Sequence, residues 1–353
     1  MSDFKPSGNA EPPLAKATAW VETACPACGG TGRRETNTMP QWAGSCWYYL
    51  RYIDPRNQTA IVDPALERYW MNVDLYVGGA EHAVLHLLYA RFWHKVLYDL
   101  GVVSTDEPFR RLVNQGIILG EDGQKMSKSR GNVVNPDTVI EEVGADSLRL
   151  FEMFMGPLEQ SKAWSTKGVL GLHRFLGRVW RLVVSEDGSL RTDLVDREMN
   201  ETELRLIHML ADRVTRDLDR MAFNTALSGF MIFLNEAAKL PEKPRGMLEW
   251  MVRLLSPFAP HIAEELWERL GQSGFVAHAA WPEADPRWTR SEEIEVAVQV
   301  QGRIRARIRV PAEADAAEVE RLALSREEIV SELAGRTPRR VIVVPGRLVN
   351  IVV

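Results

Sequence analysis

The feature that most constrains this fold is a strand, a glycine turn, a helix and a second strand that follow one another between residues 73 and 119. Val73–Val77 has the apolar run of a buried strand and ends at Gly78-Gly79. A helical pattern follows from Glu81 to Leu100, and Leu112–Leu119 is predicted to be the second strand. This order predicts a parallel crossover unit. Ligands bind such sheets at the carboxyl ends of the strands, which is where the two glycines fall.

The remaining periodicity predicts further layers. One apolar face of the crossover helix carries Val84, Leu85, Leu88, Phe92, Val96 and Leu100, with Gly101 as its stop signal. From about residue 166 the pattern is helical. Apolar side chains keep helical spacing over residues 169–183, 204–221, 248–255 and 262–270, which predicts a helical bundle.

After Trp281-Pro282 a Pro- and charge-rich segment is interpreted as a linker. Two period-two strands are then expected over residues 296–300 and 304–310, one helix over about 316–334, and a second strand pair over 341–344 and 348–352. The predicted fold class is therefore a partial Rossmann-type α/β nucleotide-binding domain, followed by an α-helical bundle and a small α+β C-terminal domain.

Composition excludes several classes of protein. The formal net charge of the 353 residues is −5, so any contact with a polyanion has to come from local basic patches. No apolar run reaches the roughly 18 to 20 residues that span a bilayer, and the polar N-terminus lacks the apolar core of a secretory signal. The three cysteines argue against a disulfide framework and predict a cytoplasmic protein.

Lys125-Met126-Ser127-Lys128-Ser129 follows the turn Gly120–Gly123. Two lysines three residues apart on a loop can both reach one polyphosphate, and each acts as a movable point charge. Cationic donors that meet the charge developing on departing pyrophosphate lower the barrier to its release, which makes Lys125 and Lys128 candidate catalytic residues. A solvated Lys/Ser surface loop is the alternative. The segment lacks the Walker pattern.

Gly78-Gly79-x-Glu81-His82-x3-His86 is a second candidate site. The glycines allow a nucleotide to approach the backbone closely, and Glu81 can accept hydrogen bonds from ribose hydroxyls. His82 and His86 lie on one face of the predicted helix. A zinc-binding pair or two structural histidines are the alternatives, although no third metal ligand is evident.

Cys25-Pro26-Ala27-Cys28-Gly29-Gly30 has the spacing of half a zinc site. No second pair of Cys or His residues with suitable spacing follows, and Cys46 is a poor candidate. Either a partner chain completes a Zn²⁺ site or the pair is a free, reduced turn.

Basic side chains gather in two places. Lys167, Arg174, Arg178 and Arg181 decorate one predicted bundle helix, and Arg303, Arg305, Arg307 and Arg309 alternate along one predicted strand. The alternation places these four arginines on one face, with Ile304, Ile308 and Val310 facing inward. Such a stripe suits RNA phosphates and predicts salt-dependent binding, while a solubilising strand face is the alternative.

The lysine pentapeptide is identical to a signature of class I aminoacyl-tRNA synthetases, and the chain as a whole resembles bacterial-type leucyl-tRNA synthetase. The matching runs cover essentially the whole chain in order: residues 35–40 (ETNTMP), 45–52 (SCWYYLRY), 74–83 (DLYVGGAEHA), 144–151 (GADSLRLF) and 344–350 (VPGRLVN). This succession is far more specific than any one motif.

The resemblance implies a domain order. Residues 1–44 hold a lead-in and the Cys-x2-Cys turn, and 45–130 the second half of the class I Rossmann domain. Residues 131–165 form a stem-contact region, 166–290 the anticodon-binding bundle, and 291–353 a tRNA-contacting α+β domain.

The resemblance also implies a function and the residues that carry it. The chain is expected to belong to a leucine–tRNA ligase that uses ATP with Mg²⁺, leucine and tRNA-Leu. The residues implied for ATP are Gly78, Gly79, Glu81, His86, Met126, Ser127, Lys128 and Ser129, and those implied for leucine are Ser45, Tyr48 and His82. The bundle and strand arginines, with Lys167, are implied to bind tRNA.

Three expected features are missing from the sequence. There is no His-x-Gly-His element, no threonine-rich editing domain and no leucine-specific insertion ahead of the lysine loop. Three interpretations follow: the C-terminal subunit of a split enzyme whose partner is an N-terminal synthetase half, a fragment of a single-chain enzyme, or a non-catalytic tRNA-binding module. The intact lysine loop and glycine turn argue against the third.

Overall fold

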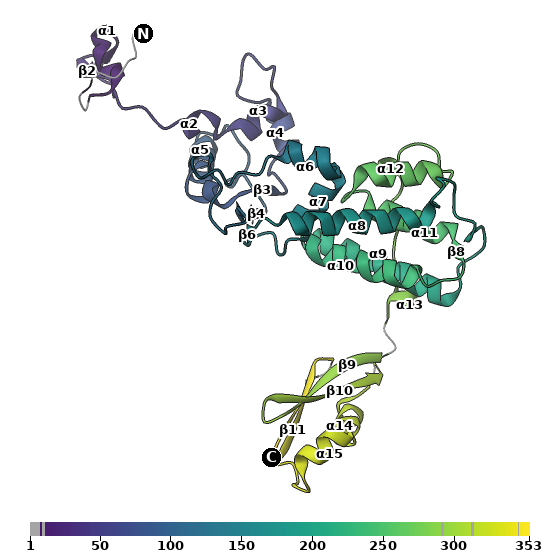
Figure 1. Ribbon diagram of the computed structural model, residues 1–353. Coiled ribbons are helices and arrows are strands. Elements are labelled where there is room, and N and C mark those ends of the chain that lie inside the picture. Colours follow the sequence, from purple (N-terminus) through teal and green to yellow (C-terminus); the bar gives the residue numbers. More distant parts are fainter. Residues whose placement is uncertain (1–7, 9–10, 291–292, 312–313, 345) are drawn as a thin grey trace. The chain divides into compact units, whose positions relative to one another are not determined.

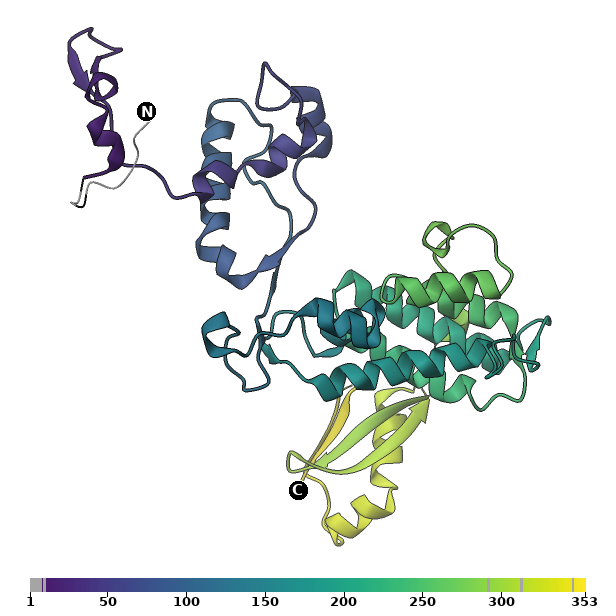
Figure 2. The same ribbon diagram turned by 45° about the horizontal axis from the view of Figure 1, so that its top comes forward.

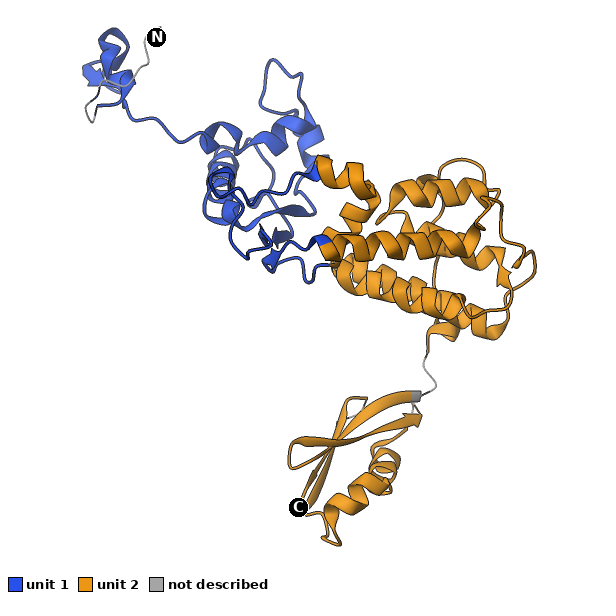
Figure 3. Cartoon of the chain, in the orientation of Figure 1, with its two compact units in different colours: residues 1–136, 155–166 blue, residues 137–154, 167–353 orange. Residues whose placement is uncertain are grey.

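The computed structural model describes residues 8, 11–290, 293–311, 314–344 and 346–353, and it divides into two compact units (Figure 3). Unit 1 comprises residues 1–136 and 155–166, and unit 2 comprises residues 137–154 and 167–353. Most of the first ten residues of the expected lead-in lie outside the described residues. So do residues 291–292 of the expected C-terminal domain and Pro345 of its motif.

Unit 1 consists of short elements. In chain order these are η1 (Pro13–Lys16), α1 (Thr18–Val21), β1 (Glu22–Ala24), β2 (Thr31–Arg33), α2 (Trp42–Ser45), α3 (Tyr48–Ile53), α4 (Pro64–Trp70), β3 (Tyr76–Gly79), η2 (Ala80–Val84), α5 (His86–Asp99), β4 (Leu112–Gln115), β5 (Ile118–Leu119), η3 (Lys128–Arg130) and β6 (Lys162–Ala163).

The predicted parallel crossover is present, with shifted boundaries. β3 and β4 pair in parallel, with Tyr76 opposite Leu112 and Gly79 opposite Gln115. The first strand was predicted too early, because Val73 makes only an isolated bridge and the two glycines lie inside β3. The second strand was predicted as continuous but breaks at Gly116. A Cβ there would lie 2.1 Å from the carbonyl oxygen of Gln160, so another segment crosses the backbone at this point.

The crossover helix was also predicted wrongly in two respects. Residues 80–84 form the 3-10 helix η2, and α5 begins only at His86, after Leu85 leaves helical geometry. The face that α5 buries contains Leu87, Ala90, His94 and Leu97, whereas Leu88 and Phe92 from the predicted apolar stripe are 55% and 59% exposed. The core of unit 1 is small, since it holds Cys46, Tyr49, Leu50, Met71, Ala90, Leu97 and Val103. Leu88 and Phe92 of α5 therefore have little cover within the described residues.

Unit 2 begins with the helical bundle. Its elements are α6 (Pro136–Val143), α7 (Ala145–Phe154), α8 (Thr166–Val183), β7 (Leu194–Val195), α9 (Glu201–Asp219), α10 (Phe223–Ala237), β8 (Lys243–Pro244), α11 (Arg245–Leu255), α12 (Pro260–Arg269), η4 (Val276–His278) and α13 (Pro286–Thr289). Helices α8 to α11 lie alongside one another around one continuous core (Figures 1 and 2).

The bundle contains the four expected helices and others that the periodicity did not reveal, of which α10 is the longest. α10 buries seven side chains or backbone positions, among them Leu227, Phe230 and Phe233. It is apolar on most sides, so it presents no clear polar and apolar alternation. α9 begins with a capping box, in which Asn200 and Glu203 each bond the other's backbone N–H.

The C-terminal part of unit 2 is a four-stranded sheet with two helices. β9 (Glu293–Val300), β10 (Arg303–Pro311), β11 (Arg340–Val344) and β12 (Leu348–Val352) pair in the order β10-β9-β12-β11, with β12 parallel to β9. The single helix predicted for residues 316–334 is two helices, α14 (Ala316–Leu324) and α15 (Glu327–Leu333). The chain turns at Ser325-Arg326, which lets Val319 and Ile329 both reach the same core.

No helix in the described part of the chain is long and apolar enough to cross a membrane.

Candidate functional site

The glycine turn of unit 1 places a carboxylate over the end of a strand. Gly78 and Gly79 are the last two residues of β3, and Glu81 lies in the first turn of η2. A Cβ on Gly79 would lie only 2.8 Å from Glu81 Oε2. A larger residue at 79 would displace the Glu81 carboxylate from this position, so the glycine leaves room for the carboxylate at this edge of the parallel sheet.

Four aromatic side chains gather beside this turn. The ring of Tyr48 lies 5.7 Å from that of His86, and the ring of Tyr76 stacks on His86 at 6.2 Å. His82 meets His86 edge-on at 6.0 Å, and the Tyr48 hydroxyl donates to that of Tyr76 at 3.3 Å. The structure thus brings together Tyr48 and His82, which were predicted for leucine, and His86, which was predicted for the adenosine. It adds Tyr76, whose place two residues before Gly78 on the same strand face was the available signal.

The surroundings of His86 and Tyr76 favour the neutral form of both side chains. Burial lowers the pKa of His86, and the nearby His82 lowers it further. Burial also raises the pKa of Tyr76, and its hydrogen bond with Tyr48 adds to the shift. His86 Nε2 is buried without a hydrogen-bond partner among the described residues. A neutral aromatic wall with one unused polar atom suits an apolar ligand that carries a polar end.

Ser45 is less closely associated with the group. It is the last residue of α2, its side chain is exposed, and no described contact joins it to Tyr48 or His82. α2 does pack against α5, so Ser45 lies near the helix that carries His86 without lining the aromatic group.

The lysine loop is a short hairpin at the end of β5. Gly120 N donates to Gln124 O at 2.9 Å, and Leu119 forms an antiparallel bridge with Lys125. On its other side β5 pairs in parallel with β6, with Ile118 opposite Lys162. The loop therefore begins at a strand whose backbone is hydrogen-bonded on both sides, while both of its lysine side chains are exposed.

Within the loop, the residues after Lys125 are also ordered. The hydroxyl oxygens of Ser127 and Ser129 lie 3.2 Å apart, and Met126 is half-buried. Lys128 begins η3, which ends at Gly131 with a left-handed backbone at φ 69°. Only Ser127 lies between the two lysines in the sequence, and Ser129 follows Lys128.

The two motifs meet through one ion pair. Lys125 Nζ lies 3.7 Å from Glu81 Oε1, although the residues are far apart in sequence and belong to different elements. Both lie in unit 1. The glycine turn, the aromatic group beside it and the lysine loop are therefore treated as one candidate site.

Cys25 and Cys28 lie in the turn that connects β1 to β2. Cys25 N donates to Gly30 O at 2.7 Å, Gly29 N donates to Cys25 O at 2.9 Å, and Gly29 is left-handed at φ 73°. Hydrogen bonds from the backbone N–H groups of Ala27 and Cys28 lower the pKa of the Cys25 thiol. Two thiols with backbone donors fit half of a zinc site. The described residues contain no group of three or more Cys, His, Asp or Glu that could hold a metal.

Two family models match the chain. Residues 73–165 match the tRNA synthetases class I (I, L, M and V), and residues 202–321 match the anticodon-binding domain of tRNA ligase. The chain belongs to the class I aminoacyl-tRNA synthetases.

The solved structures similar to this synthetase chain include a leucyl-tRNA synthetase of Agrobacterium radiobacter K84, determined as a ternary complex with tRNA and LeuAMS. It is 33% identical with a TM-score of 0.72, and the match covers 100% of this chain and 46% of that one. Two structures of Mycobacterium tuberculosis methionyl-tRNA synthetase with methionyl-adenylate share the fold at 20% and 19% identity, with TM-scores of 0.51 and 0.52. Each match covers 74% of this chain and about 60% of theirs. This synthetase chain thus spans about half the length of the leucyl enzyme.

The bundle of the synthetase chain exposes the predicted basic residues of α8. Lys167, Arg174, Arg178 and Arg181 are all exposed, and Arg178 is held by a hydrogen bond to Asn235 Oδ1 at 2.7 Å. They remain candidates for RNA contact.

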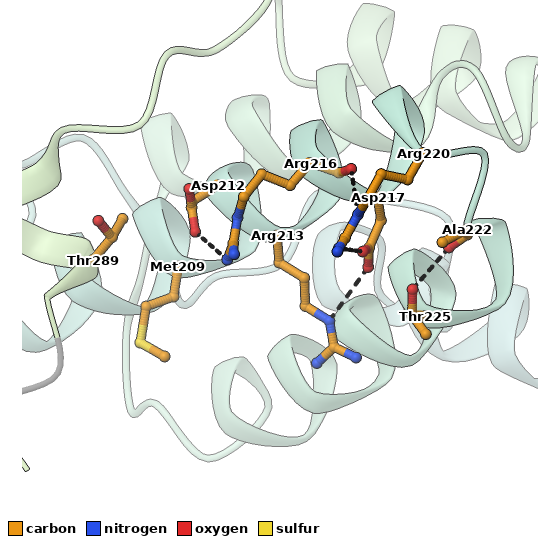
Figure 4. Close-up of a pocket in the computed structure, with 9 residues that line it drawn as sticks. All are labelled: Met209, Asp212, Arg213, Arg216, Asp217, Arg220, Ala222, Thr225 and Thr289. Carbon is orange, nitrogen blue, oxygen red and sulfur yellow. Dashed lines mark hydrogen bonds and ion pairs between the residues drawn. The ribbon is translucent and has the colours of Figure 1, made fainter. Parts of the chain in front are cut away.

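A second basic site was missed by the sequence argument. A pocket of about 570 Å³ is lined by residues of α9 and the start of α10, with Thr289 of α13 (Figure 4). Arg216 pairs with Asp212 at 2.5 Å and Arg220 with Asp217 at 2.7 Å, while Arg213 Nε lies 3.7 Å from Asp217. Three arginines against two aspartates leave one excess positive charge. The i, i+3 and i+7 spacing of residues 213, 216 and 220 was the available signal.

The predicted stripe of four arginines on one face of the C-terminal strand is not present in the structure. A bulge between Ile304 and Ala306 shifts the register of β10, so Ala306 is buried and Ile304 is 54% exposed rather than inward-facing. Arg305 pairs at 2.9 Å with Glu332 of α15, on the helix-covered face. An extra residue in one strand reverses the alternation beyond it, so Arg307 and Arg309 share the open face with Ile304 and not with Arg305. Arg307 is also paired, with Glu295 at 2.7 Å.

Proposed function

We propose that this chain forms leucyl-adenylate from ATP and leucine and transfers the leucine to tRNA-Leu, acting with residues that supply the first half of the nucleotide-binding fold. The observation that carries the proposal is the 3.7 Å contact between Lys125 and Glu81. It joins a polyphosphate-binding loop to the strand end where a nucleotide binds. A pure tRNA-binding module has no use for either.

The chemistry assigns roles to the loop. A carboxylate oxygen of leucine attacks the α-phosphorus of ATP, the bond from that phosphorus to the bridging oxygen breaks, and pyrophosphate leaves with the bonding electrons. ATP enters as its Mg²⁺ complex. Lys125 and Lys128 meet the negative charge that builds on pyrophosphate, and Glu81 accepts from the ribose hydroxyls that hold the nucleotide in register.

The amino-acid side is supported by the aromatic group. Tyr48, Tyr76 and the neutral His86 form an uncharged wall next to the glycine turn. Such a wall accepts a branched aliphatic side chain, while discrimination between aliphatic side chains that differ by one methylene is limited to roughly 1–3 kcal/mol. The 33% identity to a leucyl-tRNA synthetase along the whole chain supports leucine rather than another aliphatic amino acid as the substrate.

The surface of unit 1 supports the proposal that residues outside this chain segment complete the nucleotide-binding fold. Its parallel sheet has two strands within the described residues, which leaves the second edge of β3 without a strand. Val77 of that strand and Leu88 and Phe92 of α5 are exposed. An unpaired edge beside apolar side chains is a site for strand and helix addition. We infer that the first half of the nucleotide fold covers it, as an N-terminal half on the same or a separate polypeptide.

The tRNA is proposed to contact unit 2. The exposed basic residues of α8, the arginine pocket of α9, and Arg303, Arg307 and Arg309 offer cations for phosphates. Arg305 is withdrawn into its ion pair with Glu332. Cys25 and Cys28 would hold one side of a structural Zn²⁺ if two further ligands came from outside the described residues.

The test is leucine-dependent ATP–pyrophosphate exchange by the full chain, alone and mixed with a polypeptide that supplies the first half of the fold from the Agrobacterium relative. We expect little exchange by the chain alone and at least a 100-fold gain on mixing. Isoleucine, valine and methionine serve as controls.

Faster exchange with one of those amino acids would overturn the leucine assignment. Strong exchange by the chain alone would overturn the need for the first half. A stable mixed complex that binds tRNA tightly yet shows no exchange would instead establish a tRNA-binding module.

A further inference from the structure

One side chain beyond the lysine pentapeptide ties the loop together. Asn132 Oδ1 accepts from the backbone N–H of Ser127 at 2.9 Å. Its Nδ2 donates to both oxygens of Asp122, at 3.2 and 3.1 Å, and lies 3.5 Å from the carbonyl of Lys125. One amide thus reaches the tip of the hairpin, its outgoing strand and the middle of the pentapeptide.

Asp122 is itself fixed in place. It accepts from Gln124 N at 3.0 Å, and this bond, followed by the one from Asn132, lowers the pKa of the Asp122 carboxyl. Both side chains lie directly over Gly120. A Cβ on Gly120 would come within 2.6 Å of Asp122 Oδ1 and 2.9 Å of Asn132 Nδ2. The glycine therefore leaves room for the pair, and the hairpin that starts at residue 120 is built around it.

The contacts require an amide at position 132. The oxygen is needed for the Ser127 N–H and the nitrogen for the Asp122 carboxylate, so neither a carboxylate nor a hydroxyl can replace both functions. An aspartate at 132 would keep the acceptor for Ser127. It would also place two carboxylates about 3 Å apart where a hydrogen bond now lies, and like charges at that range repel.

We propose that Asn132 and Asp122 form a positioning pair that sets how Lys125 and Lys128 are presented to pyrophosphate. The bonded Ser127 N–H lies between the two lysines in the chain, so this contact holds the backbone from which both side chains project. Asn132 and Asp122 are assigned to the loop backbone and not to contact with the substrate. The inference rests on the proposed adenylation, and it adds the residues that order the loop before ATP arrives.

The experiment compares Asn132→Asp, Asp122→Asn and the double swap Asp122→Asn/Asn132→Asp in the full chain complemented with the first half of the fold. In the swap, an amide at 122 can donate to a carboxylate at 132, which still accepts from Ser127. We expect Asn132→Asp to lower kcat for pyrophosphate exchange at least tenfold while the KM for leucine stays within twofold. The swap should restore kcat to within threefold of the unmodified protein. Gln58→Glu, which adds a carboxylate to an exposed loop of the same unit, should change neither constant.

A second measurement does not depend on activity. Amide hydrogen exchange over residues 125–131 of the free full chain should be faster in Asn132→Asp and return to the original rate in the swap. Equal amide hydrogen-exchange rates in all variants would refute the positioning role of Asn132 and Asp122, whatever the pyrophosphate-exchange activities. A swap as impaired as Asn132→Asp would do the same. The swap restores both the net charge and the amide–carboxylate hydrogen bond, so its failure would show that this bond does not position the loop. Absence of pyrophosphate exchange in the unmodified complex would refute adenylation. The amide hydrogen-exchange comparison would still show whether Asn132 and Asp122 order the loop.

Discussion

Lys125 Nζ lies 3.7 Å from Glu81 Oε1, with side chains that are 69% and 48% exposed. An ion pair this exposed contributes less than about 1 kcal/mol, so it holds the loop near the glycine turn without locking it there. ATP offers both partners better contacts, since its ribose hydroxyls can donate to Glu81 and its phosphates can accept from Lys125. Under the proposed function, nucleotide binding replaces this contact.

Removal of either loop lysine should affect adenylation and spare tRNA binding. Loss of one donor to a developing charge typically lowers a rate on the order of 100- to 1,000-fold. We expect Lys128→Ala to lower kcat for leucine-dependent exchange in the complemented enzyme by about that factor, with a tRNA dissociation constant within twofold. Lys239→Ala, on the bundle, is the matched control. An unchanged exchange rate in Lys128→Ala would refute the assigned role.

The arginine pocket should contribute to the salt dependence of tRNA binding. Each phosphate contact that is lost reduces the slope of log K against log salt by about 0.7 to 0.9. We expect Arg213→Gln and Arg216→Gln each to produce this change in a titration of tRNA binding from low to high salt. Arg220 is left intact because its 2.7 Å contact with the buried Asp217 is shorter than the 3.7 Å contact of Arg213 with the same carboxylate. Arg56→Gln removes a charge from unit 1 and should leave the slope as it was; an equal change there would indicate a general charge effect.

Asp146 should stabilise the bundle through a helix start. It is buried on α7, and its carboxylate accepts from Ile262 N and His261 Nδ1, each at 2.8 Å, in the first turn of α12. The N-cap residue of α12, Ala259, provides no side-chain cap of its own. We expect Asp146→Ala to lower the free energy of unfolding of the bundle by about 1–3 kcal/mol and Asp146→Asn by less, because an amide oxygen still accepts.

Hydrogen exchange across α12 and urea unfolding would measure the Asp146 effect. Glu186→Ala removes an exposed carboxylate from the same bundle. The prediction fails if it is as destabilising as Asp146→Ala.

Glu107 should make unit 1 sensitive to acid. Hydrogen bonds from Arg91 and Lys95 lower the pKa of its carboxyl from 4.5 to about 2. A depressed pKa means that the contact stabilises the folded state fully above pH 4.5 and is lost as the pH falls toward 2. The partners are about half exposed, so the contribution is at most about 1 kcal/mol.

Glu107→Gln should therefore lower the thermal stability of unit 1 at pH 7 and converge with the unmodified protein as the pH falls from 4.5 to 2. Circular dichroism melts across this range would measure it. A difference that widens toward low pH would contradict the assignment.

Local patterns in the sequence were sufficient for the parts of the fold that are held by near neighbours. The parallel crossover, the helices α8, α9, α11 and α12 and the two C-terminal strand pairs follow from periodicity, because each pattern reports which face of one element is apolar. The lysine loop and the glycine turn were singled out from short motifs and from the family resemblance, and their roles stay predictions. Their chemistry depends on residues that are close together in the chain.

Tertiary structure alone decided which of those faces are used and which distant groups meet. Leu88 and Phe92 satisfy the apolar pattern of α5 but are exposed, because the core of unit 1 takes the opposite face of that helix. The alternate spacing of the four arginines predicted that they share one face of the strand. The bulge at Arg305 changes the register, so they do not. Lys125 and Glu81, Tyr76 and Tyr48, and Asn132 and Asp122 come together through turns and crossovers. Their encounter depends on the path of the backbone between them, which no spacing in the sequence records.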